Sequence, residues 1–598
     1  MFSSDKKAKV MFVNPIVGVD EGVLPMGPGI LIGGLRQIGH TVKLFDTTKY
    51  KIVSGHREGD HGPKEINEKY LNFVPVTEGY KLKPKPMMTE QEVLDQFDYE
   101  VNEFKPDVIA ITVLCSHNWG MTKLLMNRCT YKGAKVILGG KHIFTMYKEV
   151  IKVPWVDAVC IGDGEISLPI FVNRIAEGKD YKTIGNLWTK IDGEITENRL
   201  NSLLRLDNTP YPDWTDFDER LFYKPFRGRM YKYGYVEISR GCPFRCPYCH
   251  NEKEHDLFAG LGRFMRNKPI KTVCDEIRFM QETYGIEIIK FLDEEFLAKP
   301  KKYLTEFAAE YKKLNLPFLI AVRPERMTKK NAKLLADMGC VQASVGVESG
   351  NEYIRKEIYK RGMDNEVMIE GFRNFREAGI NTTSLNMIGG PYEDAEMIFD
   401  TIELNRHLKA DDVLCSVFQP YRGTSLRDLC IKEGFMDDKE ECEETTLENS
   451  VLTMPQITNN EIWGFRRTFA LYIRAPKWLY PVIGLYRKWD NTFTRFIFKI
   501  LSKKYGNRNG VTYVGHGGNG RGWTERLSFS KAEIQEQAQK RKEMFIDYEQ
   551  SIEFAGGFED LSQKEFDKVA HKSQTKVDPD KIDIEKLPIF SNNSVSGG

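Results

Sequence analysis

The segment Ser239-Arg-Gly-Cys-Pro-Phe-Arg-Cys-Pro-Tyr-Cys-His-Asn251 carries three cysteines in a C-x₃-C-x₂-C run, just after a strand-like stretch at residues 235–238. Three thiolates this close together, with no fourth cysteine nearby, can hold three corners of a cubic iron–sulfur cluster. Closed structural zinc sites and electron-transfer clusters normally use four protein ligands. Cys242, Cys246 and Cys249 therefore predict a cluster with one iron left open for chemistry.

A zinc site is the alternative for this loop. It would need a second Cys/His pair at short range. His250 and His255 are candidates, but they crowd the same loop, and Cys274 falls in a helical pattern. We therefore favour the cluster over zinc.

The spacing, with Tyr248 before the last cysteine, resembles the signature of the radical S-adenosylmethionine (SAM) superfamily. The resemblance implies that Cys242, Cys246 and Cys249 hold a 4Fe–4S cluster whose open iron is chelated by the amino and carboxylate groups of SAM. It also implies reductive cleavage of SAM to a 5′-deoxyadenosyl radical. Such a cluster needs an electron donor of the flavodoxin or ferredoxin type and protection from oxygen.

The composition is that of an ordinary globular protein of several domains: 598 residues, 41% of them hydrophobic and 29% charged. The 86 basic and 85 acidic residues are well mixed, so there is no electrostatic case for a nucleic-acid partner. The 11 scattered cysteines form no disulfide framework, and no apolar run follows Met1 or reaches the length of a bilayer span. We expect a cytoplasmic location.

Residues 1–183 alternate short apolar strands with helices, which predicts an α/β domain with a doubly wound, Rossmann-like parallel sheet. The expected strands are residues 10–13, 41–45, 108–114, 135–138 and 158–161. Sheets of this kind bind ligands beyond the carboxyl ends of their strands, where glycines permit close backbone approach.

The order of the loops at these strand ends resembles the cobalamin-binding domain that precedes many radical enzymes. The matching segments are Pro28-Gly29, Gly39-His40-Thr41-Val42, Gly139-Gly140-Lys141-His142 and Gly162-Asp163-Gly164-Glu165. The resemblance implies cobalamin contacts from Gly29, Ser116, Gly139, Gly140, Gly162, Gly164 and Glu165. The first loop has Asp20 but no suitably spaced histidine, so any cobalamin would lack a histidine ligand. A flavodoxin-like domain with another ligand, or with none, is the alternative.

Residues 184–225 are expected to form a hairpin, turning at Asp192-Gly193, and a linker. Residues 226–435 repeat a strand–helix unit six times, which predicts a partial (βα)6 TIM-type barrel with its chemistry at the strand carboxyl ends. The expected strands are residues 235–238, 286–291, 317–322, 342–347, 381–388 and 413–419. The first of them ends at the cysteine loop, so the motif and the topology agree.

Other strand ends also resemble the radical SAM pattern, notably Gly346-Val-Glu-Ser-Gly350 and Met387-Ile-Gly-Gly-Pro-Tyr-Glu393. The resemblance implies SAM contacts from Tyr248, Glu348, Ser349, Gly389 and Gly390. The barrel-mouth residues Glu294, Tyr392 and Tyr421 are candidate substrate contacts, with packing as the equal alternative. Arg323 and Arg361 are expected either to pair with carboxylates in the barrel mouth or to form surface ion pairs. No catalytic residue is assigned.

Residues 436–598 are expected to be a mainly helical C-terminal domain and tail. Aromatic and basic residues at 463–485 and 493–501 are expected in helices that pack over the barrel, and contact with a membrane or a lipid-like substrate is the alternative. The glycine-rich stretch 515–522 lacks the strand and helix of a phosphate loop and is expected to be a plain loop. Residues 531–548 resemble a solvated helix, and residues 572–598 a loosely packed tail.

Together the motifs resemble cobalamin-dependent radical SAM enzymes over about residues 9–430. The resemblance implies a methyltransferase that moves a methyl group from methylcobalamin to an unactivated carbon after hydrogen abstraction by the radical. The alternatives are a non-methylating oxidative cyclase or ring-rearranging enzyme, similar to the anaerobic chlorophyll-ring cyclase, and a non-catalytic cobalamin-binding module. The substrate is expected to be a small molecule, lipid or peptide. Cys115 and Cys160 are solitary, which disfavours a methylthiotransferase.

Overall fold

The computed structural model describes residues 6–16, 24–53, 78–80, 85–114, 116–227, 229–440, 442 and 450–505. All of these belong to one unit, Phe2–Ile546. The expectations for residues 515–522, 531–548 and 572–598 lie outside the described residues.

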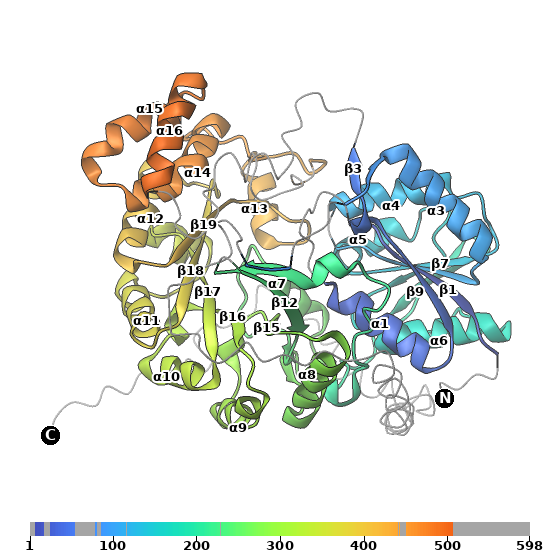
Figure 1. The fold of residues 1–598 in the computed structure, drawn as a ribbon. Helices are drawn as coiled ribbons and strands as arrows, with labels where there is room; N and C mark the ends of the chain where they lie inside the picture. Colours follow the sequence, from blue (N-terminus) through green and yellow to red (C-terminus); the bar gives the residue numbers. More distant parts are fainter. Residues whose placement is uncertain are drawn as a thin grey trace, which may run out of the picture. The chain divides into compact units, whose positions relative to one another are not determined.

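The N-terminal sheet is a doubly wound parallel sheet, as expected (Figure 1). Its parallel strands run in the order β8, β7, β6, β1, β2, so the order reverses between β1 and β6, where ligands bind in folds of this kind. The strands are β1 (Lys9–Asn14), β2 (Thr41–Asp46), β6 (Val108–Thr112), β7 (Lys135–Gly139) and β8 (Ala158–Cys160). The helices are α1 (Met26–Gln37), α3 (Glu90–Phe104), α4 (Ser116–Arg128), α5 (Lys141–Val150) and α6 (Gly164–Glu177).

The expected hairpin forms, and it extends this sheet. Strands β9 (Leu187–Ile191) and β10 (Glu194–Glu197) are antiparallel, and β9 pairs with β8. The turn residues Asp192 and Gly193 have φ of 51° and 83°, the left-handed values that a tight two-residue hairpin turn needs. The hairpin therefore belongs to the N-terminal sheet rather than to the linker.

The second sheet is the expected partial barrel of six parallel strands in chain order, with short β4 (Glu78–Gly79) and β11 (Tyr223–Phe226) pairing with its first strand. The six strands are β12 (Arg229–Val236), β15 (Ile288–Phe291), β16 (Phe318–Val322), β17 (Cys340–Glu348), β18 (Asn381–Ile388) and β19 (Asp412–Val417). Helices α8 (Ile270–Tyr284), α9 (Lys301–Tyr311), α10 (Lys329–Met338), α11 (Asn365–Glu377) and α12 (Ala395–Leu408) lie along the outside of the strands (Figure 1).

The first barrel strand is displaced from its expected position. Residues 237 and 238 lie beyond the end of β12, because the Asp293 carboxylate accepts the backbone N–H of Ile238 at 3.1 Å. The strand instead begins at Arg229, within a stretch whose polar residues hide the strand pattern. The cysteine loop still follows directly from this strand end.

The two faces of the barrel sheet differ in burial. The outward side chain of Phe291 packs on Phe307 and Phe318, with ring centroids 5.9 and 5.4 Å apart. Inward-facing residues such as Ser344, Leu385 and Leu414 remain partly open to solvent. The barrel therefore has an open lumen that leads to the carboxyl ends of its strands.

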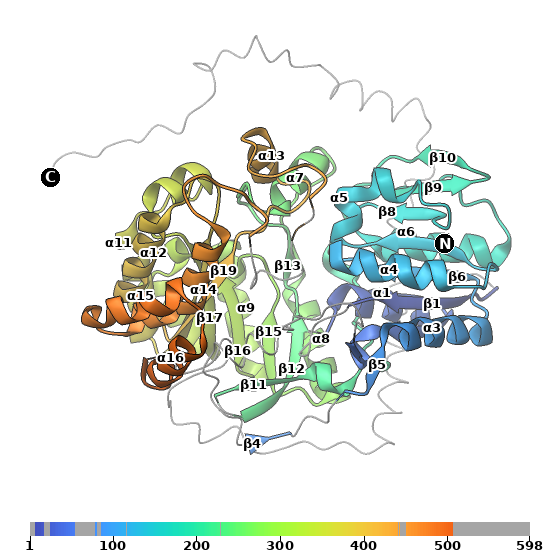
Figure 2. The ribbon, with the colours of Figure 1, turned by 90° about the horizontal axis from the view of Figure 1, so that it is seen from above.

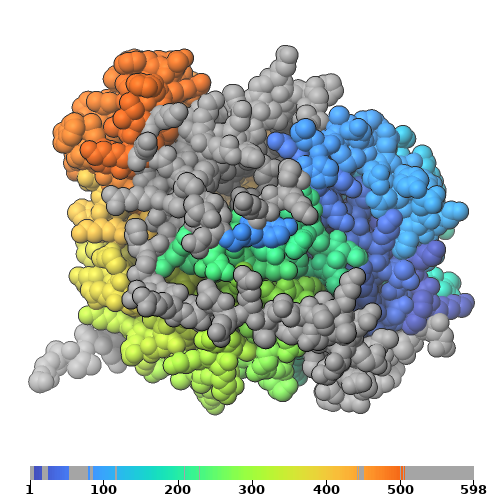
Figure 3. Space-filling model, in the orientation of Figure 1, coloured from blue at the N-terminus to red at the C-terminus, as the bar shows by residue number. Residues whose placement is uncertain are grey.

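The C-terminal helices are α14 (Asn459–Arg474), α15 (Tyr480–Lys488) and α16 (Thr492–Tyr505). They lie beside the last barrel elements, as expected (Figure 3). Phe399 of α12 packs on Phe465 of α14 at 5.2 Å, and Arg406 donates to the carbonyls of Tyr472 and Ala475 at the end of α14. In the described part of the chain, none of the helices is both long and apolar enough to cross a membrane.

Candidate active site

The three predicted cluster cysteines lie in a loop that is held at both ends. Before the loop, Asp293 accepts a hydrogen bond from the Ser239 hydroxyl at 2.5 Å. Gly241 has φ of 85°, and a Cβ there would lie 2.6 Å from the carbonyl of Phe264, so only glycine fits. After the loop, α7 (His250–Leu257) begins next to Cys249. The loop geometry is therefore imposed by its surroundings.

Helix α7 ties the loop to two other elements. Its Glu252 accepts from Ser425 of α13 (Ser425–Lys432) at 2.5 Å, and Figure 2 shows the two helices side by side. Its Glu254 pairs with Lys141 of α5 in the N-terminal domain. His255 bonds the carbonyl of Cys242 at 2.7 Å. The cysteine loop thus sits between α13 of the barrel and α5 of the first domain.

The thiols suit a cluster better than a single metal ion. All three are free, and burial raises the pKa of Cys242 to about 11 and also raises that of Cys249, so they become thiolates only when a metal displaces the protons. Among the described residues, these cysteines included, no three Cys, His, Asp or Glu side chains converge closely enough for one metal ion. The ligands of a cubic cluster bind separate irons and need no such convergence. This favours the cluster over the zinc alternative.

Arg323 reaches the cysteine loop from the end of β16. Its guanidinium donates to Cys246 Sγ at 3.4 Å, pairs with Glu325 at 2.6 Å and lies 3.8 Å from the centre of the Phe244 ring. Arg323 is therefore a buried group in the barrel mouth and not part of a surface ion pair. It faces the sulfur atom that would bind an iron of the cluster.

The residues predicted to bind SAM gather around a second buried arginine, Arg361. It donates to the Tyr248 hydroxyl at 3.1 Å and to the carbonyl of Gly346 at 2.5 Å, and it lies 3.7 Å from Glu348. A bulge at the end of β17 places Glu348 at φ of 64°, a strained value that aims its carboxylate at the mouth. Burial raises the pKa of Glu348, and Arg361 opposes that shift. The expected pairing of Arg361 with a mouth carboxylate is confirmed.

The Gly389-Gly390 turn lies against the same cluster of residues. A Cβ on Gly390 would lie 2.2 Å from the Tyr359 hydroxyl, and the Tyr359 ring meets that of Tyr248 at 5.4 Å. Ser349 is wholly buried, and its hydroxyl lies 3.3 Å from that of Thr401, so it supports the turn after β17. SAM contacts from these residues stay a prediction, but four of the five surround one site.

Glu393 organises the Gly389-Gly390 turn by accepting the backbone N–H of Gly389 at 2.6 Å. Burial raises the pKa of Glu393 to about 8. Because the pKa of Glu393 is higher in the folded protein than in the unfolded chain, the unfolded chain ionises first as pH rises. The contribution of Glu393 to stability is therefore full below about pH 4 and is lost as pH rises to about 8.

We therefore expect Glu393→Gln to match the wild type at pH 4.5 and to be roughly 2–4 kcal/mol more stable at pH 8.5, since the amide cannot ionise. Urea unfolding at both pH values measures this difference. An equal effect at the two pH values would contradict the assignment, and Glu396→Gln in the exposed first turn of α12 is the control.

The loop after β8 meets the cysteine loop through Arg240. The Arg240 guanidinium pairs with Asp163 at 2.9 Å, Glu165 at 2.5 Å and Glu237 at 2.7 Å, and Arg266 adds a 2.6 Å contact to Asp163. Burial alone would raise the pKa of Asp163, but the two guanidiniums lower it below its usual value. Glu165, a predicted cobalamin contact, is thus engaged with the strand that leads to the cysteines.

The other predicted cobalamin residues divide between packing and open positions. A Cβ on Gly29 would lie 2.4 Å from Trp214 Nε1, and one on Gly140 would lie 2.5 Å from the carbonyl of Val113. Packing alone therefore requires glycine at these two positions. Gly162, with φ of 104°, faces the ring of Phe258, the residue that follows α7. Gly139 is the last residue of β7, Gly164 is the first residue of α6, and Ser116 is the first residue of α4. Their contacts with cobalamin stay predictions.

The candidate substrate residues lie at three strand ends. Glu294 is open to solvent in the barrel mouth, and the protein around it raises its pKa. Tyr392 packs against Phe435 at 5.5 Å, which favours its packing role, whereas Tyr421 is 38% exposed near the His250 ring.

Lys290 is an inward-facing lumen residue that sequence reasoning missed. It lies in register with Tyr235 and Leu319, and its side chain is open to solvent between buried neighbours in the strand. Surrounding protein lowers its pKa, and no carboxylate in the described part of the chain opposes the shift. The signal was present in the sequence as a lysine inside the apolar run Ile288–Phe291.

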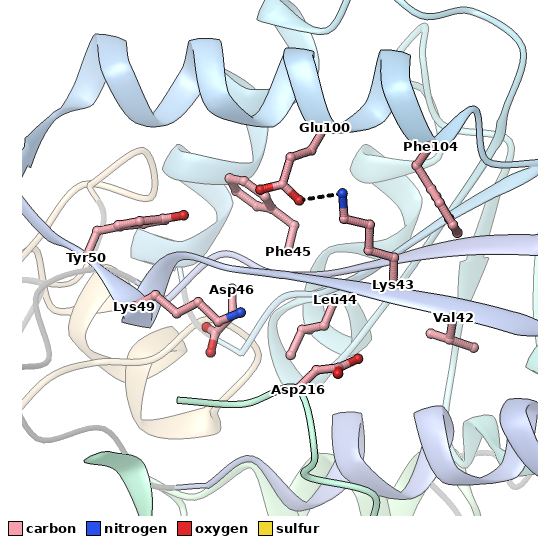
Figure 4. A pocket seen from close by; sticks show the side chains of 10 residues that line it. All are labelled: Val42, Lys43, Leu44, Phe45, Asp46, Lys49, Tyr50, Glu100, Phe104 and Asp216. Carbon is pink, nitrogen blue, oxygen red and sulfur yellow. Dashed lines mark ion pairs between the residues drawn. The ribbon is translucent and has the colours of Figure 1, made fainter. Parts of the chain in front are cut away.

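Arg240 was missed as well, although it adjoins the cysteine motif, because ion pairing across domains leaves no local pattern. A hollow of about 390 Å³ lies at the outer edge of the N-terminal sheet, where Lys43 pairs with Glu100 at 2.9 Å and Asp216 closes the opposite side (Figure 4). None of the predicted site residues lines this hollow.

Two protein-family models match parts of this chain. The Radical SAM superfamily matches residues 236–404, which begin at the end of β12 and include the cysteine loop. The B12 binding domain matches residues 77–172, which include β6, β7, β8 and the loop with Asp163 and Glu165.

Two curated relatives are methyltransferases by name. An uncharacterised methyltransferase of Pyrococcus horikoshii is 25% identical over 382 residues, covering 63% of this chain and 81% of its own length. The cytidylyl-2-hydroxyethylphosphonate methyltransferase of Streptomyces wedmorensis is 22% identical over 499 residues, covering 76% of this chain and 87% of its own.

Solved structures show the same fold. The cobalamin-dependent SAM radical enzyme OxsB with aqua-cobalamin bound aligns over 94% of this chain and 84% of its own, with a TM-score of 0.56 and 14% identity. The radical SAM methyltransferase TsrM from Kitasatospora setae, with cobalamin and its 4Fe–4S cluster bound, aligns over 76% and 83%, with a TM-score of 0.51 and 17% identity.

The barrel, the open three-cysteine loop and the upstream sheet therefore define a radical SAM enzyme with a B12-binding domain. The chain combines a Radical SAM domain with a B12 binding domain, and it shares its fold with solved cobalamin-dependent radical SAM enzymes. Its cofactors are a 4Fe–4S cluster, SAM and cobalamin. Cys242, Cys246 and Cys249 fit the cluster, because their thiols are free and do not converge on one ion.

Proposed function

We propose that the protein is a cobalamin-dependent radical SAM methyltransferase that moves a methyl group to an unactivated carbon of its substrate. The observation that carries this is the Arg240 network, which joins the loop of the B12-binding domain directly to the strand that leads into the cysteines. The bound cofactors would supply a carbon-centred radical source and a methyl donor. The methyltransferase names of the two curated relatives support the choice of reaction.

The protein's own groups would act mainly by positioning the reactants and excluding water. Arg361 and Glu348 would hold the polar groups of the nucleoside, while Tyr248 and Gly390 would flank it. The substrate would enter the lumen, where its reacting carbon meets the mouth of the barrel. We further propose a cytoplasmic setting with a flavodoxin- or ferredoxin-type electron donor.

A non-methylating reaction is the second candidate. The anaerobic magnesium-protoporphyrin IX monomethyl ester cyclase of Rubrivivax gelatinosus is 24% identical over 346 residues, covering 56% of this chain and 60% of its own. The two reactions share the cluster loop and the B12-binding domain, so the fate of the methyl group must separate them.

The test is an anaerobic incubation of the reconstituted enzyme with methyl-labelled SAM, cobalamin, a low-potential reductant and candidate substrates. Label that mass spectrometry detects in the product supports methylation. A confirmed product without label supports the cyclase alternative. Failure of the iron-loaded protein to split SAM would reject both.

Lys290 is expected to bind an oxyanion of the substrate, because it is a cation in a recess where the described residues provide no counter-ion. We expect Lys290→Met to raise KM by about tenfold or more, as loss of a charged hydrogen bond implies. SAM cleavage without substrate and iron content should not change, and Lys290→Arg should recover part of the loss.

The lowered pKa of Lys290 can be checked without a substrate. With limiting acetic anhydride at pH 8, we expect Lys290 to be acetylated faster than Lys271 and Lys302, whose side chains are 89% and 87% exposed. Slower labelling of Lys290, measured by peptide mass spectrometry, would show that the amine is inaccessible or ordinarily basic.

A further inference from the structure

Large apolar side chains are concentrated on the surface of the C-terminal helices. Six of the thirteen exposed large hydrophobic residues in the described part of the chain fall between positions 478 and 500. They are Trp478, Leu485, Trp489, Phe493, Phe496 and Ile500, with exposed fractions between 41% and 72%. Exposed apolar groups at this density mark an interaction surface.

Helix α16 has two apolar faces. Phe498 is buried against Tyr486 of α15, with ring centroids 4.6 Å apart, and this face holds the helix on the domain. Phe493, Phe496 and Ile500 follow the spacing i, i+3, i+7, so they share another face of the helix, and each is more than half exposed. The packing of the domain does not use this second face.

Helix α15 repeats the arrangement. Ile483 is buried, whereas Pro481 and Leu485 are exposed four residues apart and Trp489 follows four residues later. A hollow of about 320 Å³ opens beside these three residues, and Tyr480 and Arg487 also line it. The surface therefore combines protruding aromatic side chains with a recess.

The charge of this region selects the partner. Residues 474–505 contain a single acidic residue, Asp490, which pairs with Arg495 at 2.6 Å. The same stretch holds eight basic residues, although the whole chain is nearly neutral: Arg474, Lys477, Arg487, Lys488, Arg495, Lys499, Lys503 and Lys504. A second copy of this surface would repel it, whereas an anionic surface would attract it.

We propose that α15 and α16 dock the protein on an anionic lipid bilayer, with the aromatic side chains at the headgroup level. Tryptophan and phenylalanine favour this interfacial depth, and each nearby lysine or arginine adds attraction to anionic lipids. The helices lie on the surface and do not cross it. The proposal is independent of the reaction, because it concerns a surface outside the barrel mouth.

The test measures co-sedimentation of the full-length, anaerobically reconstituted protein with sucrose-loaded vesicles. Vesicles of phosphatidylcholine with 30 mol% phosphatidylglycerol are compared with phosphatidylcholine alone. We expect binding to the anionic vesicles only, weakened by 0.5 M salt. The variant Trp489→Ser/Phe493→Ser/Phe496→Ser should bind at least about tenfold more weakly, because it loses its apolar anchors. Lys488→Glu/Lys504→Glu should lose affinity for anionic vesicles.

The matched control is Met87→Ser/Tyr99→Ser/Val367→Ser, which removes three exposed apolar side chains elsewhere and should bind as the wild type does. Thermal unfolding checks that every variant folds. Absence of vesicle binding by the wild type, or equal binding by the patch and control variants, would overturn the proposal. So would a dimer in size-exclusion chromatography that the patch variant dissociates, or aromatic side chains that a soluble quencher cannot reach because residues 506–598 cover them.

Discussion

Cys246→Ala is expected to remove SAM cleavage down to the level of the iron-free protein. Cys246 is buried, and Arg323 donates to its sulfur, so its thiolate would hold one iron in an enclosed position. A cluster left with two thiolates cannot keep one iron open and stay bound to the protein. Iron content, the cluster absorption band and the yield of 5′-deoxyadenosine after reduction measure the loss.

The chain offers matched controls for this experiment. Cys274 and Cys340 are also free and buried, but they lie in α8 and at the start of β17, the end opposite the barrel mouth. Cys274→Ala and Cys340→Ala should keep wild-type iron content and SAM cleavage, with only a small loss of stability. A Cys246→Ala protein that retains the cluster and cleaves SAM would mean that the loop is not its ligand set.

Features encoded in local sequence were predicted well. The helix Glu90–Phe104 has its start marked in the sequence by a capping box at Thr89 and Glu92. The helix Lys329–Met338 is likewise bounded by local signals, since Thr328 caps its start and Gly339 its end. The three cysteines are identified by their spacing alone. Periodicity, caps and ligand spacing are local signals, and the sequence contains them in full.

Features that depend on contacts across the fold were not predicted. Arg240 and Asp163 are 77 residues apart, and no pattern in either segment reveals that they pair. The hairpin Leu187–Ile191 with Glu194–Glu197 was recognised, but its partner β8 was not, because the exposed edge of a sheet carries no sequence signature. The role expected for Glu165 depended on a resemblance of loops, whereas its ion pair depends on the arrangement of two domains.

Arg240→Met is the sharpest test of how the two domains cooperate. The substitution leaves Asp163, Glu165 and Glu237 facing one another without their shared cation. All three carboxylates are at least four-fifths shielded from solvent. Removing one partner from such a network costs about 3–5 kcal/mol at neutral pH, because the remaining charges stay buried.

The pH dependence separates this cause from general damage. In the wild type, the pKa of Asp163 is lower in the folded protein than in the unfolded chain, so its ionised carboxylate contributes stability at pH values above the unfolded-state pKa. That stability is lost only as pH falls through the folded-state pKa. In Arg240→Met the carboxylates take up protons more readily, so the deficit measured by urea unfolding should shrink between pH 7 and pH 5. A deficit that is independent of pH would mean that packing, not charge, is lost.

The consequence for the reaction follows from the position of Arg240 between the two cofactor loops. In Arg240→Met, SAM cleavage should persist because the three thiols remain, whereas methyl transfer should fall well below it, since the B12 loop keeps only the ion pair between Asp163 and Arg266. Arg245→Met is the control: Arg245 lies in the same loop but pairs with exposed Asp256 on the surface, where an ion pair contributes roughly 0–1 kcal/mol. Equal losses of cleavage and transfer in Arg240→Met would place its effect on the cluster alone, whereas a selective loss of transfer would identify it as the residue that aligns the two cofactors.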